Sequence, residues 1–497
     1  MRTWLVILAV WGFILSVFAG GRRTHQMRDG TVLGFERHQT VSYIGRVPTT
    51  SWDADKTYRV PVVLFSFADC DFSCEDPRQF YDRLFNEPGY NLGVGPGCVA
   101  DYFRDQSRGL FNVHFDIFGP VRLNSQQKTD DKYNRGSSQF YEAMQAVDPQ
   151  VNFADYVWSG EDYVPTVIFI YAGYGGNESA EAATGCIHPN TGYYGRRFDD
   201  VRVSYYSASA ELWSNNVSCG IGTICHEYCH TFGIPDFYPT QGDEYSVLDE
   251  WDLMDGGCFA GDGWCPPNLS IYERELMKWQ TAVDLTTTTD VTNMQPFDQG
   301  GLAYRIVNDA YTSEYYLLEN RQQIGWDFML PGHGLLISHV DDNRSFWGYV
   351  NDSPSHHCYE YFHADHHDFN YYENLYGRKN VYSDDGRSIR LQYTAYPYTD
   401  VDGMVHDALT DTTTPSASLF HARADGSLFM GKPITQIQET DGLISFHFSD
   451  TPDAITSLPV DNVPVAFYDL QGHMVETPSR GIYIIRNADG TTKKVFR

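Results

Sequence analysis

Positive charge is scarce in this chain. Its 497 residues contain 35 Lys and Arg against 65 Asp and Glu, which gives a formal net charge of −30. A surface this acidic repels phosphate groups, so neither nucleic acid nor an anionic lipid surface is expected as a partner. The chain also contains no low-complexity tract and no internal repeat. Apolar residues make up 42% of it, enough for packed cores, and its length predicts two substantial domains with terminal additions.

A long apolar run is absent except at the start of the chain. Residues 1–19 combine Arg2, an apolar stretch and the small residue Ala19, which is the layout of a secretory signal peptide. A membrane anchor is the alternative, but the run is short for a spanning helix and Arg22 and Arg23 follow it closely. The mature protein is therefore expected to be exported, without a transmembrane anchor.

Cysteine is missing from residues 20–57, a short N-terminal segment, which excludes inhibition of a metal centre by a thiol from there. The ten cysteines that follow predict disulfides, because the export signal places the protein in an oxidising compartment. Cys70 with Cys74, and Cys258 with Cys265, are close enough in sequence to close small loops. Spacing alone does not decide the pairing.

Helix and strand signals alternate between residues 58 and 283, which predicts an α+β domain. The apolar runs VPVVLFSF (60–67) and PTVIFIYAGYG (165–175) predict buried strands. Asp76 followed by Pro77 predicts the start of a helix whose apolar face carries Phe80, Leu84 and Phe85. Residues 99–109 predict a second helix, and residues 110–119 an alternating strand.

Helix signals become scarce from residue 284 to 450, where we expect a β-rich, sandwich-like domain. Residues 451–497 are expected to form a small separate β domain. Strands are predicted between Gly, Asp and Pro turns at 301–307, 314–321, 334–340, 389–396 and 442–448, and in the last segment at 463–472 and 480–487.

The stretch HEYCHTFGIPD, residues 226 to 236, carries the chemistry. His226 and His230 lie one helical turn apart and share a face of the predicted helix, where two neutral imidazoles can bind one zinc ion. Glu227 lies beside the first histidine and can hold the metal-bound water as a general base. Gly233 permits a left-handed backbone reversal after the helix. The spacing therefore predicts a catalytic zinc centre rather than a helix that merely ends at a glycine.

Asp236 is the expected third ligand of this centre. The reversal at Gly233 returns the chain towards the metal and leaves a fourth coordination position open for water, as a catalytic zinc site requires. Acidic residues beyond the turn are alternatives that the spacing leaves open, namely Asp243, Glu244 and Glu250.

Two features near this motif have both a structural and a functional interpretation. Met254, in WDLMDGG (251–257), either lies in a tight turn beneath the metal or is an ordinary core residue. Cys225 and Cys229 are rotated by about 100° from the neighbouring histidines on the helix, so burial as small apolar groups is favoured over metal binding.

A second group of histidines lies in SHHCYEYFHADHHDF (355–369) and lacks helical ligand spacing. A solvated loop is the favoured interpretation, and a secondary metal site is the alternative. Acidic turns such as TDVDGM (399–404) add the expectation of structural Ca²⁺, although no EF-hand spacing is present. The histidines of the group are His356, His357, His363, His366 and His367.

HEYCHTFGIPDFY followed by WDLMDGG resembles the immune inhibitor A family of secreted bacterial zinc metallopeptidases. CVADYFRDQSRGLF (98–111) and YYLLENRQQIGWDFMLPGHGLLISHVDDN (315–343) are also similar, and the likeness extends from residue 60 to 448. The resemblance implies a zincin-like (metzincin-like) catalytic domain that binds Zn²⁺. Members of the family commonly carry a long pro-domain, which residues 20–57 are too short to form.

The end of the chain resembles the C-terminal sorting domains of the type IX secretion system. The similar stretches are AFYDLQGHMVE (466–476) and GIYIIRNADGTTKKVFR (481–497). This likeness implies passage through the periplasm to the cell surface or the medium, with the secretion machinery as a partner. A final hairpin of the β-rich domain is the alternative.

These features together predict a secreted zinc-dependent endopeptidase that acts on extracellular proteins. Glu227 would take a proton from water and pass it to the leaving amine. The alternative from another class is a catalytically inactive surface adhesin or binding protein on the same scaffold. Such a protein has no use for Glu227, which weighs against this alternative. Cleavage preference and oligomeric state do not follow from the sequence.

Overall fold

The computed structural model divides into two compact units. Unit 1 consists of residues 1–268, 346–355 and 368–390, and unit 2 of residues 269–345, 356–367 and 391–497. The predicted boundary between residues 283 and 284 lies after the first division, which falls between residues 268 and 269. No sequence signal indicated that residues 346–355 and 368–390 belong to unit 1. The predicted signal peptide, residues 1–19, lies outside the described residues. The structure describes residues 22–27, 30–36, 52–158, 160, 162–240, 246–342, 350–376, 381–451, 464–468, 475, 482–487 and 492–496.

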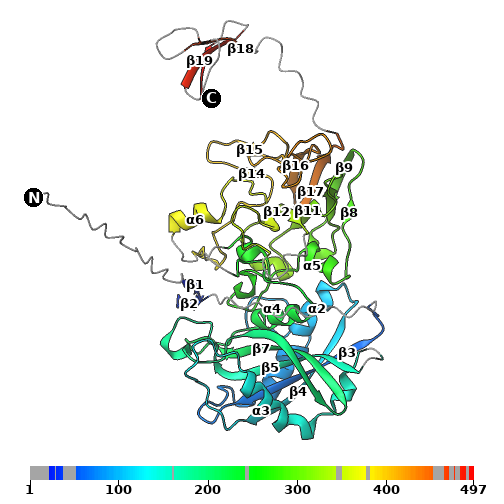
Figure 1. Cartoon of the computed structure of the whole chain (residues 1–497), viewed down its shortest axis with the longest axis vertical. Helices are drawn as coiled ribbons and strands as arrows, with labels where there is room; N and C mark the ends of the chain where they lie inside the picture. The colour runs from blue at the N-terminus through cyan, green and yellow to red at the C-terminus, as the bar shows by residue number, and fades with distance from the viewer. Residues whose placement is uncertain are drawn as a thin grey trace, which may run out of the picture. The chain divides into compact units, whose positions relative to one another are not determined.

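Unit 1 is built around a five-stranded mixed sheet (Figure 1). Its strands lie in the order β4-β3-β5-β7-β6, parallel except for β6, which pairs antiparallel with β7 at the edge. The central strands are continuous apolar runs, as expected for parallel strands that are buried on both faces. The predicted strands at 60–67 and 165–175 are confirmed. The strands are β3 (Thr57–Ser66), β4 (Asn112–Arg122), β5 (Tyr163–Tyr174), β6 (Asn190–Phe198) and β7 (Val201–Leu212).

The helix predicted after Asp76 is α1 (Pro77–Asn86), and its start is confirmed. The Asp76 carboxylate accepts a hydrogen bond of 3.1 Å from Gln79 N, which caps the first turn. Leu84 and Phe85 are buried as predicted, but the third buried side chain is Tyr81 rather than Phe80. The other helices of this unit are α2 (Val99–Gln106), α3 (Ser137–Val147), α4 (Gly222–Thr231) and α6 (Phe369–Tyr376).

Helices cover both faces of this sheet (Figure 1). On one face Phe140 of α3 stacks on Phe169 of β5, with ring centroids 4.6 Å apart. On the other face Tyr228 of α4 contacts Phe115 of β4 at 5.9 Å. Phe115 is aligned with Val60 of β3 and Phe169 with Val63, and residues three apart on one strand point to opposite faces. Helix α4 is thereby held against the sheet with its length buried.

In unit 2 a five-stranded and a three-stranded sheet share one apolar core. Residues such as Leu318 and Ile337 of the five-stranded sheet pack in the same cluster as Val291 and Phe446 of the three-stranded sheet. The five-stranded sheet has the order β13-β12-β11-β10-β8 and consists of β8 (Val283–Asp284), β10 (Tyr304–Val307), β11 (Glu314–Arg321), β12 (Gly334–Asp341) and β13 (Tyr359–Tyr361). The three-stranded sheet consists of β9 (Thr289–Met294), β16 (Ile434–Thr440) and β17 (Leu443–Phe448).

Four of the five strands predicted in this region are confirmed, as β10, β11, β12 and β17. The strand predicted at 389–396 is wrong, because a turn occupies its centre. Leu391 has φ +54°, and Thr394 N donates to Leu391 O at 3.3 Å. A left-handed residue interrupts an extended chain. This unit also contains three short elements: α5 (Ile271–Leu276), β14 (Tyr398–Thr399) and β15 (Val405–His406).

The two ends of the chain carry small antiparallel sheets. Near the N-terminus β1 (Arg22–Gln26) pairs with β2 (Val32–Glu36). At the C-terminus β18 (Pro464–Tyr468), β19 (Ile482–Asn487) and β20 (Thr492–Phe496) form a three-stranded sheet. The predicted strand patterns of the last segment are confirmed, whereas its role in sorting stays a prediction.

The expected disulfides are wrong. All ten cysteines lie among the described residues and carry thiols. Cys70 Sγ donates to Asp71 O at 3.8 Å, and Cys258 Sγ donates to Asp255 O at 3.9 Å. Most of the thiols, including that of Cys265, are enclosed in the core, where cysteine packs as a small apolar group.

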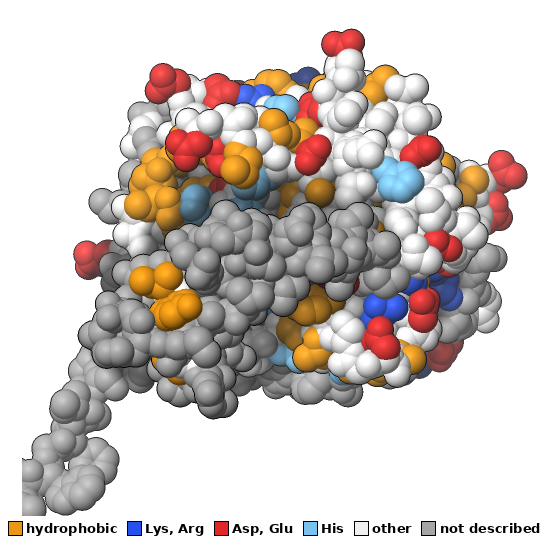
Figure 2. Space-filling model, turned by 90° about the horizontal axis from the view of Figure 1, so that it is seen from above, with side chains coloured by type: hydrophobic (Ala, Val, Ile, Leu, Met, Phe, Trp, Pro, Cys, Tyr) orange, Lys and Arg blue, Asp and Glu red, His pale blue; other side chains and the backbone are white. Residues whose placement is uncertain are grey.

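The surface reflects the acidic composition. Figure 2 shows acidic side chains spread over the face in view, with basic side chains gathered in only a few places. Among the described residues, no helix combines the length and the apolar character needed to cross a bilayer.

Candidate metal centre

Helix α4 carries the first two predicted ligands. It runs from Gly222 to Thr231, and all of its residues are buried, the polar ones included. The chain reverses at Gly233, which has φ +93° and donates from its backbone N to His230 O at 3.0 Å. The left-handed conformation predicted for this glycine is confirmed.

The structure brings His226, His230 and Asp236 together. Asp236 Oδ1 lies 3.2 Å from His226 Nε2 and 3.2 Å from His230 Nε2. All three side chains are buried, and their ligand atoms form one group with the spacing of a metal site. Atoms bound to one tetrahedral zinc ion at about 2.0–2.1 Å lie about 3.3 Å apart, so the observed distances fit that ion.

The outer nitrogens of both imidazoles meet backbone carbonyls. His226 Nδ1 lies 2.9 Å from Leu253 O, and His230 Nδ1 lies 2.7 Å from Ile234 O. A carbonyl only accepts, so each Nδ1 carries a hydrogen, and in the neutral ring each Nε2 presents its lone pair to the centre. Within the described part of the chain, Asp236 Oδ1 receives no hydrogen bond. Lone pairs converging in this way require a positive charge between them.

The electrostatics of the group agree with that requirement. Burial disfavours the Asp236 carboxylate, but the facing His230 and His226 imidazoles outweigh burial and hold its pKa below the ordinary value. Burial likewise disfavours charge on His230, yet Asp236 raises the pKa of that imidazole to about 9. The centre therefore stabilises a cation, which a proton or a metal ion can supply.

Glu227 lies beside this group without belonging to it. Its Oε2 accepts from Thr191 Oγ1 at 2.9 Å, and the same hydroxyl lies 2.6 Å from Glu227 O. Burial raises the pKa of the Glu227 carboxyl, against the lowering effect of His230 and His226. Thr191 belongs to the edge strand β6, and nothing in its sequence context singled it out. Only the packing of α4 against β6 brings the two side chains together.

The WDLMDGG segment lies directly against the centre. Leu253 O is the partner of His226 Nδ1, and Met254 O accepts from Phe237 N at 3.0 Å, next to Asp236. Met254 is also fully buried. The two interpretations of Met254 therefore coincide, because the residue belongs to the core and its turn supports the centre.

The alternative ligands lie elsewhere or have other partners. Asp243 and Glu244 lie outside the described residues. Glu250 is buried, and its Oε1 accepts from Tyr382 OH at 2.6 Å. Cys225 and Cys229 are buried within α4, and burial raises the pKa of the Cys225 thiol well above its ordinary value. Burial as apolar groups therefore agrees with the structure for both cysteines.

Calcium is expected at TDVDGM (399–404), a turn that the Asp400 side chain holds together. Asp400 Oδ1 accepts from Asp402 N and from Met404 N, at 2.9 Å each. These bonds explain the acidic residue at the start of the turn without an ion. Calcium binding stays a prediction.

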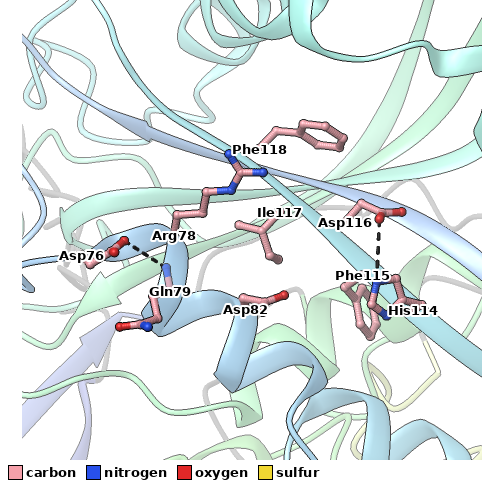
Figure 3. A pocket seen from close by; sticks show the side chains of 9 residues that line it. All are labelled: Asp76, Arg78, Gln79, Asp82, His114, Phe115, Asp116, Ile117 and Phe118. Carbon is pink, nitrogen blue, oxygen red and sulfur yellow. Dashed lines mark hydrogen bonds and ion pairs between the residues drawn. The ribbon is translucent and has the colours of Figure 1, made fainter.

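A separate polar pocket of about 450 Å³ lies between α1 and β4 (Figure 3). Its carboxylates have structural partners: Asp76 caps α1, Asp82 accepts from Asn86 at 3.1 Å, and Asp116 pairs with Arg59 at 2.9 Å. The pocket contributes no residue to the metal centre. Its lining consists of Asp76, Arg78, Gln79, Asp82, His114, Phe115, Asp116, Ile117 and Phe118.

Comparison with known proteins agrees with the geometry of this centre. Residues 203–283 match the family model described as Immune inhibitor A peptidase M6, catalytic domain. This stretch contains α4, Asp236 and the WDLMDGG turn. The predicted likeness to that family is confirmed for this stretch, whereas the likeness of the C-terminus to sorting domains stays a prediction.

Two curated relatives from Vibrio cholerae serotype O1, strains M66-2 and ATCC 39315 / El Tor Inaba N16961, are also similar to the chain. Each is named pre-pro-metalloprotease PrtV and is 22% identical over 247 residues. The match covers 41% of this chain and 26% of each relative, so the chain spans about a quarter of the length of these relatives. The chain thus carries a region similar to metallopeptidase catalytic domains.

Proposed function

We propose that the protein is a zinc-dependent endopeptidase in which His226, His230 and Asp236 hold the metal and Glu227 is the general base. The convergence of two Nε2 atoms and one Oδ1 atom, 3.2 Å apart, beside a buried glutamate carries this proposal. The match of residues 203–283 to a metallopeptidase catalytic domain supports it.

The chemistry divides between the ion and the protein. Zinc, when bound, supplies Lewis-acid polarisation of the substrate carbonyl and lowers the pKa of water. Leu253 O and Ile234 O orient the two imidazoles through their Nδ1 atoms. Thr191 holds the Glu227 carboxylate, which takes the proton of the attacking water and returns it to the leaving amine.

The edge of the sheet offers a place for an extended peptide. Among the described strands β6 is the edge strand of the unit 1 sheet, and an edge strand is where an extended peptide can add to a sheet. Thr191 connects this strand to Glu227, and Tyr193, two residues further along, is 52% exposed. A substrate strand paired with β6 would run beside the general base. We therefore propose extended segments of proteins as the substrate class.

Casein zymography of the purified chain tests the activity. A cleared band is expected with zinc present, and it should disappear with a chelator and return when zinc is restored. Chelator sensitivity distinguishes a metallopeptidase from a contaminating serine or cysteine protease. A zinc-loaded, folded chain that clears neither casein nor a mixed peptide library would contradict the proposal and favour a binding protein.

We also propose that the protein is exported, with residues 1–19 as signal peptide and residues 451–497 as a sorting domain for type IX secretion. The three-stranded sheet of β18, β19 and β20, which pairs with no other described strand, supports this proposal. Deleting residues 451–497 should leave an active peptidase in the periplasm, measured by fractionation and zymography. Normal arrival of the truncated chain at the cell surface or in the medium would disprove the sorting role.

A further inference from the structure

A second cluster of one carboxylate and two imidazoles lies in unit 2. Asp341 Oδ2 is 2.7 Å from His356 Nε2 and 3.0 Å from His421 Nε2. The three ligand atoms all lie within 4.8 Å of one another. Asp341 ends β12, His356 precedes β13, and His421 comes from the loop before β16. Three segments that are distant in sequence therefore contribute one group each.

The backbone around these residues is held independently of any ion. Asp341 N donates to Cys358 O at 2.9 Å, which joins the end of β12 to the segment that carries His356. His421 N donates to Glu314 Oε2 at 3.0 Å. The same carboxylate accepts from His339 Nε2 at 2.8 Å, so Glu314 anchors the His421 loop to the sheet. The cluster is thus preorganised by the fold.

Aromatic rings orient both imidazoles. His356 stacks on Phe420 with centroids 3.8 Å apart, and His339 stacks on Phe420 at 4.8 Å, so the Phe420 ring lies between two imidazoles. Tyr311 stacks on His421 at 3.8 Å. The His356 and His421 side chains are 37% and 33% exposed, so both imidazoles reach the surface.

One oxygen of the carboxylate between these imidazoles lacks a hydrogen-bond donor among the described residues, while the other, Oδ2, faces both rings. The Asp341 side chain is 1% exposed, and no described residue gives a hydrogen bond to its Oδ1. A buried carboxylate is costly unless it is paired or coordinates a metal. The two Nε2 atoms face Oδ2, where a cation would bind to all three groups at once.

We propose that Asp341, His356 and His421 form a second metal site, which takes a divalent first-row transition ion such as zinc. Two imidazole nitrogens and one carboxylate oxygen suit zinc, whereas Ca²⁺ and Mg²⁺ prefer oxygen ligands alone. Three protein ligands leave one position of a tetrahedral ion for a further ligand. The site lies wholly in unit 2 and does not depend on the proposed peptidase function.

Zinc stoichiometry of the full-length chain tests the site. The wild-type protein and its variants are equilibrated by dialysis in buffered zinc, and bound metal is measured by inductively coupled plasma mass spectrometry. His356→Ala/His421→Ala removes the second site, and His226→Ala/His230→Ala removes the first. His447→Ala is the matched control, because this imidazole is also 33% exposed and lies 2.7 Å from a single carboxylate, Asp290.

Two ions are expected in the wild type and in the His447→Ala control, and one in each double variant. If the wild type binds one ion, and only the His226→Ala/His230→Ala variant loses it, the cluster is an ion pair alone and the proposal is wrong. Loss confined to the other double variant would support the second site and contradict the first. Near-UV circular dichroism reports folding. Asp341→Asn, which keeps the shape of the side chain, decides the question if a double variant misfolds, with zinc affinity expected to fall about 10-fold or more.

Discussion

The molecule carries two clusters of the same composition, two histidines and one aspartate, in two different settings. In unit 1 the three groups come from one helix and the turn after it. Both imidazoles are buried, and the Nδ1 atom of each forms a hydrogen bond with a backbone carbonyl. In unit 2 the groups come from three separate segments, and the imidazoles are half exposed and stacked on aromatic rings.

The groups next to each cluster differ more than the ligands do. Glu227 adjoins the first cluster, and among the described residues its carboxylate makes one side-chain hydrogen bond, to Thr191, so it has capacity left to accept a proton. Glu314 adjoins the second cluster, but its oxygens already accept from His339, Phe420, His421 and Asn308. A carboxylate engaged in this way anchors backbone and is not free to act as a base. The comparison teaches that two clusters of the same side chains can differ in the carboxylate that adjoins them, which one cluster leaves with spare capacity and the other uses to anchor backbone.

The largest effect is expected for the base. Glu227→Gln should lower kcat for casein by roughly 10²–10⁴-fold, the usual contribution of positioned proton transfer, with zinc content unchanged. Initial rates and metal analysis of the same preparation measure both quantities. Glu178→Gln is the matched control, since Glu178 is also buried in unit 1 and accepts from Ser214 N at 2.9 Å. Activity of Glu227→Gln within tenfold of the wild type would refute the assigned role.

The third ligand should show the next largest effect. Asp236→Ala is expected to weaken zinc binding in unit 1 by about 10–100-fold or more, because it removes the carboxylate that faces both imidazoles. Competition with a coloured chelator measures the affinity. Glu250→Gln is the control and should bind zinc as the wild type does, since the Glu250 carboxylate already accepts a hydrogen bond from Tyr382 OH. Weaker binding in Glu250→Gln, with normal binding in Asp236→Ala, would transfer the ligand role to Glu250.

A smaller effect is expected at the residue that orients the base. Thr191→Val should lower kcat by roughly 10-fold with little change in KM, because the Glu227 carboxylate loses the one side-chain donor that the described residues give it, while the strand edge is kept. Thr191→Ser retains the hydroxyl and should restore the rate. If the serine and valine variants are equally impaired, Thr191 acts through packing alone and is not a positioning residue.

The smallest effect concerns the second cluster. Zinc should raise the Tm of the wild type by more than it raises that of His421→Ala, by about 2–4 °C, if the ion in unit 2 contributes on the order of 1 kcal/mol. Differential scanning calorimetry with and without zinc measures the difference. His447→Ala should respond to zinc as the wild type does. An equal rise in His421→Ala would mean that the second cluster adds no metal-dependent stability.

The errors of sequence interpretation share one physical origin. The run at 389–396 alternates like a strand, but Leu391 takes a left-handed conformation that periodicity cannot reveal. The cysteine pairs at 70 and 74 and at 258 and 265 have spacings that suit small loops, yet all four are free thiols, and Cys258 and Cys265 are buried. In both cases tertiary packing overrides a local pattern.

The group around α4 could be predicted because its information is local. Two histidines four residues apart share a helix face whatever surrounds them, and Gly233 permits the reversal that carries Asp236 back. Thr191 and the cluster of Asp341, His356 and His421 have no such signature. Thr191 meets Glu227 only because β6 packs against α4. The second cluster forms only because Cys358 O binds the end of β12 and the Glu314 carboxylate binds the backbone of the His421 loop. Spacing along the chain determines contacts within one turn of helix, whereas contacts between distant segments are decided by how the sheets and loops pack.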